Sequence, residues 1–239
     1  LHVERLAAGV ELKAAVDIGG TTTWAEGHDD WWYEVDEPFE RSRWAWRSGD
    51  LAIDVRLAST LPPIDHAAAL ATLQLAGSER DHYEAIGRFS GTVSVAGATV
   101  PVDGLFVRDH TWGAREYHRF GPSWWWPTCF DGGAAYAGGV AVALEDRTVG
   151  YGLVADEHGV AATPVVELEV DGQAAPGGYA GTTIRYVPEG REPVALTSVT
   201  RRHLCTTFPG FGADRQWNEA YSTCRWGPRE GFGSRELGC

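Results

Sequence analysis

Short segments in which apolar and polar residues alternate recur along the chain, and this pattern constrains the fold more than any other feature. Residues 51–57 alternate Leu, Ile, Val and Leu with Ala, Asp and Arg, and residues 166–170 alternate Val, Leu and Val with two glutamates. A period of two is typical of a β-strand with one apolar and one polar face. Similar short segments cover residues 10–16, 91–95, 135–144, 182–187 and 194–199. Because turn residues separate them at regular intervals, the sequence predicts an all-β fold, an antiparallel barrel or sandwich.

Residues 64–75 are the one segment that favours a helix. Alanine occupies positions 67, 68, 69 and 71, and the pair Pro62–Pro63 stands directly before the segment. Alanine has the highest helix propensity, and proline is tolerated in the first turn of a helix. We therefore expect one short helix as a minor ingredient of the fold.

A weak internal repeat bears on the domain organisation. The glycine-led segment 91–95, followed by Pro101–Val102, resembles segment 181–185, followed by Pro193–Val194. The similarity is either a coincidence between two strands or the trace of two similar half-chains that meet near residue 115. On the second interpretation, residues 1–115 form an N-terminal domain and residues 116–239 form a C-terminal domain, packed closely together.

Charge and composition exclude several classes of function. The chain carries 20 basic and 33 acidic residues, a net charge of −13, which disfavours binding to nucleic acid or to an anionic membrane surface. Its hydrophobic content of 44% is that of an ordinary globular protein. No apolar run is long enough for a membrane span, and no leader is recognisable. The four cysteines form no CxxC pair, so we expect neither a zinc site nor a disulfide framework, and a reducing, cytoplasmic location. The chain contains no methionine, so Leu1 is not expected to be the true start.

The first aromatic motif lies in residues 24–46, which contain five tryptophans. In a strand, Trp31 and Tyr33 face one side and Trp32 faces the other. The segment is therefore either a core strand, with Glu26 solvated near its end, or the wall of a ligand pocket. Both interpretations remain open from the sequence.

The second motif places ionisable residues at the end of a strand pattern, in the order Arg108, Asp109, His110 and, after one threonine, Trp112. If Asp109 faces inward, burial raises its pKa and makes it a candidate proton donor. If the other face of the strand points inward, Arg108, His110 and Trp112 face the interior together. The alternative to a functional role is a structural one, in which these side chains link two sheets by hydrogen bonds. The structural role is favoured for Arg108 and Arg115. A functional role is favoured for Asp109 and His110.

Other aromatic residues offer weaker signals. Three consecutive tryptophans begin at Trp124, and they cannot all face one side of a strand. They therefore cover an interface or line the mouth of a pocket, where an indole face could stabilise a transient cation. Tyr117 and Tyr136 are candidates for the same pocket.

Familiar catalytic and metal-binding patterns are missing from the sequence. His110 and His118 are the only histidine pair close enough to suggest a metal, and no third ligand lies near them, so no metal site is predicted. The glycine pairs at 132–133 and 138–139 lack the context of a dinucleotide site, and there is no Gly-x-Ser-x-Gly element. No cofactor is predicted.

The two motifs resemble a known family. The run Asp30-Trp31-Trp32-Tyr33 is similar to the Glu-Trp-Trp-Tyr-Phe element of the hydroxyneurosporene synthase-like proteins, and Asp109-His110-Thr-Trp112 is similar to their Asp-His-x-Trp element. Residues 83–115 are closer still to a bacterial branch with an Arg-Asp-His-Ser/Thr-Trp-Gly-x-Arg signature. The resemblance implies two packed lipocalin-like β-barrel domains with a hydrophobic ligand site. Its known relatives include carotenoid hydratases and lipocalin-like cyclases.

The resemblance implies an enzyme that binds a hydrophobic unsaturated molecule, isoprenoid or polyketide-like, and performs cofactor-free, acid-assisted hydration, dehydration or cyclisation at a double bond. Asp109 and His110 are the predicted catalytic residues. The predicted substrate-binding residues are Trp31, Trp32, Tyr33, Trp112, Tyr117, Trp124 and Tyr136. Arg108, Arg115 and Glu26 are predicted to be structural or to orient the substrate. The alternative is a non-catalytic carrier of apolar ligands, and a homodimer is compatible with either function.

Overall fold

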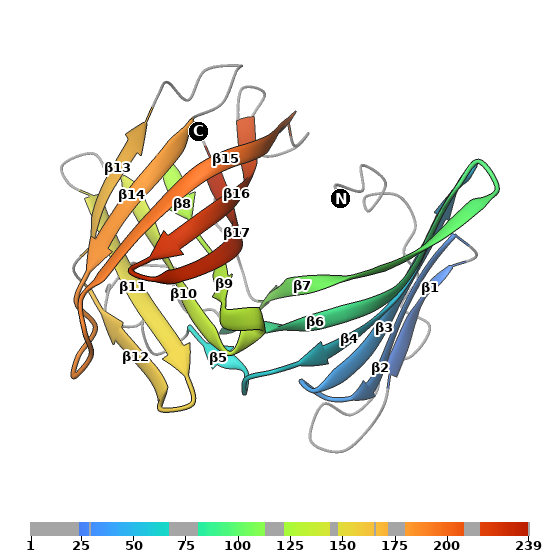
Figure 1. Cartoon of the computed structure of the whole chain (residues 1–239), viewed down its shortest axis with the longest axis horizontal. Coiled ribbons are helices and arrows are strands. Elements are labelled where there is room, and N and C mark those ends of the chain that lie inside the picture. The colour runs from blue at the N-terminus through green and yellow to red at the C-terminus, as the bar shows by residue number, and fades with distance from the viewer. Residues whose placement is uncertain are drawn as a thin grey trace. The chain divides into compact units, whose positions relative to one another are not determined.

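The computed structural model describes residues 24–28, 30–66, 81–112, 122–143, 148–164, 166–171, 180–207 and 216–238. Within these ranges almost every residue belongs to a β-strand, and the strand pairings between neighbours are antiparallel (Figure 1). One turn of 3-10 helix, η2 (Asp131–Gly133), is the only helical element in the same ranges. None of the residues described here forms a helix long and apolar enough to cross a membrane.

The chain divides into two compact units. Unit 1 comprises residues 1–62 and 87–106, and unit 2 comprises residues 63–86 and 107–239. In this division β6 (Asp81–Val95) and β7 (Ala98–Trp112) each belong partly to both units, and the boundary after residue 115 stays a prediction. Within unit 2, residues 63–86 contact the C-terminal strands: the His66 ring stacks on Trp125, and the His82 ring lies tilted against the same indole.

Unit 1 is a meander of antiparallel strands. Its strands are β1 (Trp24–His28), β2 (Trp31–Glu37), β3 (Arg41–Ser48), β4 (Leu51–Ser59), the C-terminal part of β6 and the N-terminal part of β7. The hydrogen-bonded order is β1-β2-β3-β4-β6, and β7 pairs with β6. The β6–β7 hairpin turns at Ala96 and Gly97, which have φ of 49° and 83°. Positive φ at both positions is what a two-residue hairpin loop requires.

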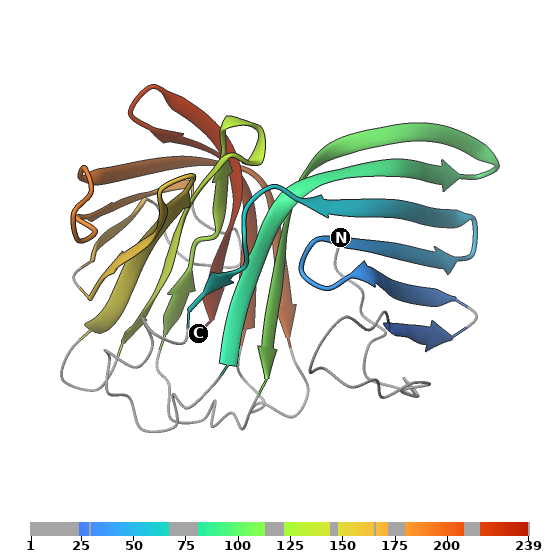
Figure 2. The ribbon, with the colours of Figure 1, turned by 90° about the horizontal axis from the view of Figure 1, so that it is seen from below.

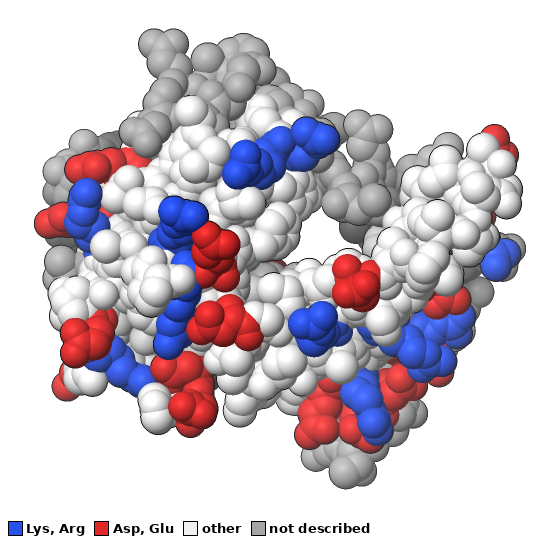
Figure 3. Space-filling model, in the orientation of Figure 1, with Lys and Arg blue, Asp and Glu red and all other residues white. Residues whose placement is uncertain are grey.

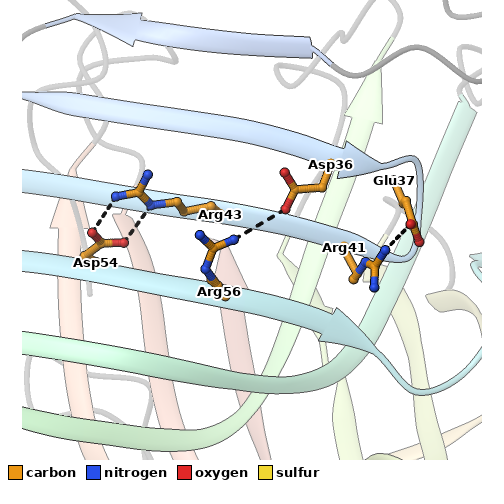
Figure 4. A network of polar contacts seen from close by, with 6 residues as sticks. All are labelled: Asp36, Glu37, Arg41, Arg43, Asp54 and Arg56. Carbon is orange, nitrogen blue, oxygen red and sulfur yellow. Dashed lines mark hydrogen bonds and ion pairs between the residues drawn. The ribbon is translucent and has the colours of Figure 1, made fainter.

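The two faces of the unit 1 sheet differ as the alternation predicts. Ile53 and Val55 are 6% exposed and belong to the apolar face. On the polar face, Arg43 donates to both carboxylate oxygens of Asp54, at 2.8 and 2.6 Å (Figure 4). The same view shows that Arg56 pairs with Asp36 and Arg41 with Glu37. The predicted strand over residues 51–57, with one apolar and one polar face, is confirmed.

Unit 2 contains one large antiparallel sheet of order β12-β11-β10-β8-β17-β16-β15-β14-β13, in which β9 pairs with β10 and β17. The bounds are β8 (Ser123–Trp125), β9 (Thr128–Phe130), β10 (Ala135–Ala143), β11 (Thr148–Asp156), β12 (Gly159–Thr163), β13 (Glu167–Asp171), β14 (Gly181–Tyr186), β15 (Val194–Thr207), β16 (Gln216–Trp226) and β17 (Arg229–Gly238). The first part of β6 and the short strand β5 (Ile64–Asp65) also belong to unit 2.

The large sheet curls so that strands far apart in its order face one another (Figure 2). The hydroxyl of Tyr186 in β14 donates to the carbonyl of Leu153 in β11 at 2.9 Å. Arg191 pairs with Asp156 at 3.2 Å. A Cβ on Gly152 would overlap the Tyr186 ring, so the approach depends on glycine. Side chains from β10, β11, β14, β15 and β16 fill the interior, which is the hydrophobic core of unit 2.

The predicted helix over residues 64–75 is wrong at its start. Ile64 and Asp65 form β5 and pair with Glu84 and Tyr83 of β6. Ile64 is completely buried, so tertiary packing outweighs the weak helix propensity of this segment. Residues 67–75 lie outside the part of the chain that is described.

Acidic and basic side chains are interspersed over the face shown in Figure 3. In unit 2, ion pairs join Arg185 to Glu169 at 3.2 Å and Arg225 to Glu230 at 2.7 Å. Exposed pairs of this kind contribute at most about 1 kcal/mol each. The folded state of unit 2 therefore depends on its apolar core rather than on its surface charges.

Candidate functional site

Five buried side chains with polar groups gather in unit 2, and we call them the buried polar cluster. They are His66, His82, Glu84, Tyr136 and Tyr151, of which His82 is 3% exposed and the others 0%. His66 directly follows β5, while His82 and Glu84 lie two residues apart in β6. Residues two apart in a strand point to the same face, so β6 directs both side chains inward. Tyr136 and Tyr151 come from β10 and β11, which pair with each other.

The cluster is held together by contacts that centre on His66. Its Nδ1 lies 2.7 Å from the hydroxyl of Tyr151, and its Nε2 lies 3.5 Å from Oε2 of Glu84. The His66 and His82 rings stack with centroids 4.3 Å apart, and the backbone N–H of His66 donates to the carbonyl of His82 at 2.9 Å. The β5–β6 pairing therefore sets the positions of both imidazoles.

Several polar atoms of the cluster make no hydrogen bond of good geometry to the residues described. They are Nε2 of His66, both carboxyl oxygens of Glu84 and the hydroxyl of Tyr136. A buried polar atom without a partner costs about 1–3 kcal/mol. Such a concentration in one place indicates a function that retains it in spite of this cost.

The environment keeps both tyrosines of the cluster protonated. Burial raises the pKa of Tyr136 well above its usual value of 10.0, and the nearby negative charge of Glu84 raises it further. The pKa of Tyr151 is raised for the same two reasons. Both phenols are therefore neutral at physiological pH, and each can donate a hydrogen bond.

The consecutive tryptophans divide between the core and the cluster. Trp126 is 1% exposed and belongs to the hydrophobic core of unit 2, against which Trp124 also packs. Trp125 points the other way, with its ring 4.4 Å from that of His82 and 5.7 Å from that of His66. Because alternate residues of a strand face opposite sides, one indole covers the cluster while its neighbours fill the core.

Asp109 and His110 lie on opposite faces of β7, which continues unbroken to Trp112. Oδ1 of Asp109 is 3.0 Å from Nε2 of His82, and the Asp109 side chain is 54% exposed rather than desolvated. The His110 ring stacks on Tyr83 at 5.2 Å, and Nη2 of Arg108 lies 3.4 Å from its Nδ1. Partial burial, and then the charge of Arg108, lower the pKa of His110.

The remaining predicted site residues are dispersed. Tyr33 is 9% exposed and belongs to the apolar face of unit 1. Trp31 and Trp32 line a surface hollow of about 540 Å³ in unit 1, together with the Arg43–Asp54 pair. Glu26 and Trp112 lie in β1 and β7, but their side chains are outside the described part of the structure, as are Arg115 and Tyr117 entirely.

The sequence analysis missed His66, His82, Glu84 and Tyr151. The local signal was the segment 82–86, in which His82, Glu84 and Ile86 share one strand face. No local pattern connects this segment with His66 or with Tyr151, which is 85 residues further along the chain than His66. Of the group, His66, His82 and Glu84 offer ligand atoms that all lie within 4.8 Å of one another and could hold a metal ion.

Comparison with known proteins gives a family and a fold. The model of a family described as "Domain of unknown function (DUF7064)" matches residues 11–238. No curated protein matches the chain. Several solved structures share its fold and are compared below.

A candidate AttH protein from Nitrosomonas europaea is 18% identical, with a TM-score of 0.67 over 89% of this chain and 69% of that one. Kievitone hydratase from Nectria haematococca is 11% identical, with a TM-score of 0.56 over 93% and 69%. CghA, in a structure with Sch210972, is 8% identical, with a TM-score of 0.63 over 94% and 72%. The all-β, lipocalin-like fold class expected from the sequence is confirmed.

Proposed function

The chain belongs to the family described as "Domain of unknown function (DUF7064)", and from this premise we propose that it is an enzyme with the buried polar cluster as its reaction centre. The proposed reaction is acid-assisted hydration, dehydration or cyclisation at a double bond of a hydrophobic small molecule. The fold is shared with a protein named as a hydratase and with CghA, which was solved with the small molecule Sch210972. The shared fold is consistent with this chemistry, and the evidence for it comes from the residues of the buried polar cluster.

The observation that carries the proposal is the set of buried polar atoms that make no hydrogen bond of good geometry, above all both carboxyl oxygens of Glu84. Removing a carboxyl group from water without compensating hydrogen bonds is costly. A carrier of apolar ligands gains nothing from such a group, whereas an enzyme needs buried polar and charged groups at its reaction centre. The cluster therefore favours an enzyme over the alternative, a non-catalytic carrier.

The cluster contains both proton donors and proton acceptors. In a hydration, an imidazole of the cluster gives its proton to one carbon of the double bond while a phenol such as Tyr136 hydrogen-bonds to the substrate, and water adds its oxygen to the other carbon. The proton that this water loses is accepted by Glu84 and returned to the imidazole, so that the net change is the addition of one water. In a cyclisation, the same donors hydrogen-bond to the substrate and hold it in a reactive conformation.

Asp109 has a different proposed role from a buried acid. Its half-exposed carboxylate touches the buried His82 imidazole, so the pair connects the cluster to solvent. We assign to this pair the exchange of protons with water between turnovers. His110 is proposed to act from the opposite face by fixing Tyr83 in place, with Arg108 beside it. Trp125 supplies an apolar wall next to the two imidazoles.

The test is incubation of the protein with a panel of unsaturated isoprenoid and polyketide-like compounds, followed by mass spectrometry. Hydration appears as the mass gain of one water, labelled when the solvent is H₂¹⁸O, and cyclisation as an isomer of unchanged mass. We expect Glu84→Gln and Tyr136→Phe to reduce turnover by roughly 100-fold or more. The matched control is Glu230→Gln, at an exposed glutamate that pairs with Arg225.

Two results oppose the proposal. Unchanged turnover in both cluster variants removes the cluster as the reaction centre. Tight binding of an apolar compound that wild-type protein never converts, across the whole panel, favours the carrier. Extraction of any compound that co-purifies with the protein indicates which part of the panel to extend. A cytoplasmic location, a homodimer and substrate contacts by Trp31 and Trp32 remain predictions.

A further inference from the structure

We infer that His66, His82 and Glu84 form a binding site for one divalent transition-metal ion, and that Zn²⁺ matches the site best. The inference deepens the proposed function, on which it rests for the assignment of the cluster as a reaction centre. With the ion bound, the three side chains would act as ligands, and the ion would supply the polarisation of water or substrate in place of the proton transfers assigned above to Glu84 and the imidazoles. Metal binding is measured without any substrate, so the two proposals can fail separately. The sequence analysis expected no metal because it considered only the pair His110 and His118.

The donor set is the first argument. Two imidazoles and one carboxylate are the protein ligands of a common class of catalytic zinc site, and they also occur in non-haem iron sites. In this chain the three side chains are all buried, and their ligand atoms lie within 4.8 Å of one another. His66 directly follows β5, and His82 and Glu84 lie in β6, so the backbone pairing of these two strands holds the three residues together.

The distances within the set are the second argument. Two ligands that each lie about 2.1 Å from a tetrahedral ion are about 3.4 Å apart. Nε2 of His66 and Oε2 of Glu84 are separated by 3.5 Å, which is long for a hydrogen bond and close to the spacing of two ligands of one ion. All three ligand atoms lie within 4.8 Å of one another, so small side-chain shifts would bring them to the spacing of ligands of one ion.

The orientation of the imidazoles is the third argument. A histidine that binds a metal usually uses its other ring nitrogen for a hydrogen bond, which fixes the tautomer. Tyr151 contacts Nδ1 of His66 at 2.7 Å, so Nε2 is left to face Glu84. Nε2 of His82 lies 3.0 Å from a carboxylate oxygen of Asp109. A carboxylate in this position orients the imidazole, so that its other nitrogen, Nδ1, would bind the ion.

A simple ion pair between a protonated His66 and Glu84 explains the geometry less well. Both side chains are completely buried, and neither Nε2 of His66 nor the carboxyl oxygens of Glu84 make a hydrogen bond of good geometry in the part of the chain described. A buried ion pair is favourable only when good hydrogen bonds accompany it. A divalent ion would satisfy these atoms together, and three protein ligands would leave one position for water or substrate.

The experiment uses the full chain without affinity-tag histidines, stripped with a chelator and then dialysed. Zn²⁺ is titrated in competition with a chromophoric chelator, and Co²⁺ is added to a second sample for its absorption spectrum. We expect one Zn²⁺ per chain, a Co²⁺ spectrum typical of tetrahedral coordination, and a higher melting temperature with Zn²⁺. His66→Gln and Glu84→Gln should weaken Zn²⁺ binding by roughly 100-fold or more.

His158→Gln is the matched control, because the His158 side chain is 70% exposed in the β11–β12 turn, and its Zn²⁺ affinity should equal that of wild type. Tyr151→Phe retains all three ligands, so it tests the metal site even if the ligand variants fail to fold. It should weaken Zn²⁺ binding by roughly 10- to 100-fold through the loss of the contact with His66.

The metal site is refuted if wild type takes up no stoichiometric Zn²⁺, or if Glu84→Gln binds it as tightly as His158→Gln does. If chelator-treated protein still turns over substrate and takes up no Zn²⁺, the metal site is refuted and the proposed function is retained. Stoichiometric Zn²⁺ binding by a protein that converts no compound supports the metal site and opposes the proposed function.

Discussion

Nδ1 of His66 lies 2.7 Å from the hydroxyl oxygen of Tyr151, and both side chains are completely buried. This contact between the residue after β5 and the middle of β11 determines which nitrogen of His66 faces Glu84. It joins a segment near residue 65 to a strand that starts near residue 148, so the cluster exists only in the folded unit 2.

Replacing Tyr151 with phenylalanine should destabilise the protein even without a ligand. The change leaves Nδ1 of His66 buried without its observed partner, which costs about 1–3 kcal/mol. We expect the midpoint of urea unfolding to fall by the corresponding amount with an unchanged slope. Tyr221→Phe is the control, because Tyr221 is only half-buried and its hydroxyl contacts Glu219 at a long 3.4 Å. Equal midpoints for the two variants would mean that the Tyr151 contact is not stabilising.

The pKa of His110 predicts a pH dependence of stability. Partial burial and the neighbouring Arg108 lower this pKa below 6.5 in the folded state, so the unfolded chain binds a proton more readily. The free energy of unfolding should therefore fall as the pH drops below about 6.5 and level off below the folded pKa. Well above pH 6.5 both states are neutral at this residue, and its contribution is constant.

His110→Gln isolates the effect from that of the other histidines. Urea unfolding of wild type and variant between pH 5 and pH 8 gives two curves, whose difference should change only on the acidic side. A difference that is constant across the whole range would contradict a lowered pKa. Direct titration of the His110 ring by NMR provides a second reading.

The buried thiols should be unreactive in the folded protein. Burial raises the pKa of Cys129 to about 12 and also raises that of Cys224, whose Sγ accepts a hydrogen bond from Arg235. Because only the thiolate reacts, iodoacetamide at pH 8 should leave both residues unlabelled, while denaturant should allow full labelling. Peptide mapping by mass spectrometry measures each site, and rapid labelling of Cys129 in native protein would contradict the buried position of β9.

Gly152 should not tolerate a side chain. An alanine Cβ would overlap the Tyr186 ring where β11 and β14 face one another, and such overpacking costs about 1–3 kcal/mol. We expect Gly152→Ala to lower the melting temperature. Adding Tyr186→Leu should cost less in the alanine background than in wild type, which a double-mutant cycle measures. Fully additive effects would mean that the two strands do not meet at these residues.

The fold could be predicted from the sequence because a β-strand with one buried face shows a local alternation of apolar and polar residues. The alternation over residues 51–57 predicted the buried Ile53 and Val55 and the exposed Arg56. The parity of the second motif likewise placed Asp109 and His110 on opposite faces. In contrast, the helix expected over residues 64–75 begins as β5, because pairing with β6 and burial of Ile64 are tertiary effects.

Much less of the candidate site could be predicted from the sequence. Parity predicts which residues share a face, but it does not predict which face is covered, and Asp109 proved half-exposed while Glu84 is buried. The cluster unites side chains from four separate segments, and only the spacing of His82 and Glu84 is visible locally. Tyr136 was named from the sequence as a pocket aromatic, whereas its place beside Glu84 depends on how β6 lies in unit 2.

One comparison tests whether the buried polar cluster is a reaction centre: kcat of wild type and of Glu84→Gln on the first compound of the panel that wild type converts. The substitution keeps the size of the side chain and removes its charge and its basicity. If Glu84 takes part in the reaction, kcat falls by roughly 100-fold or more, while circular dichroism stays the same. A kcat within about twofold of wild type in a folded Glu84→Gln protein would contradict the assignment of the cluster.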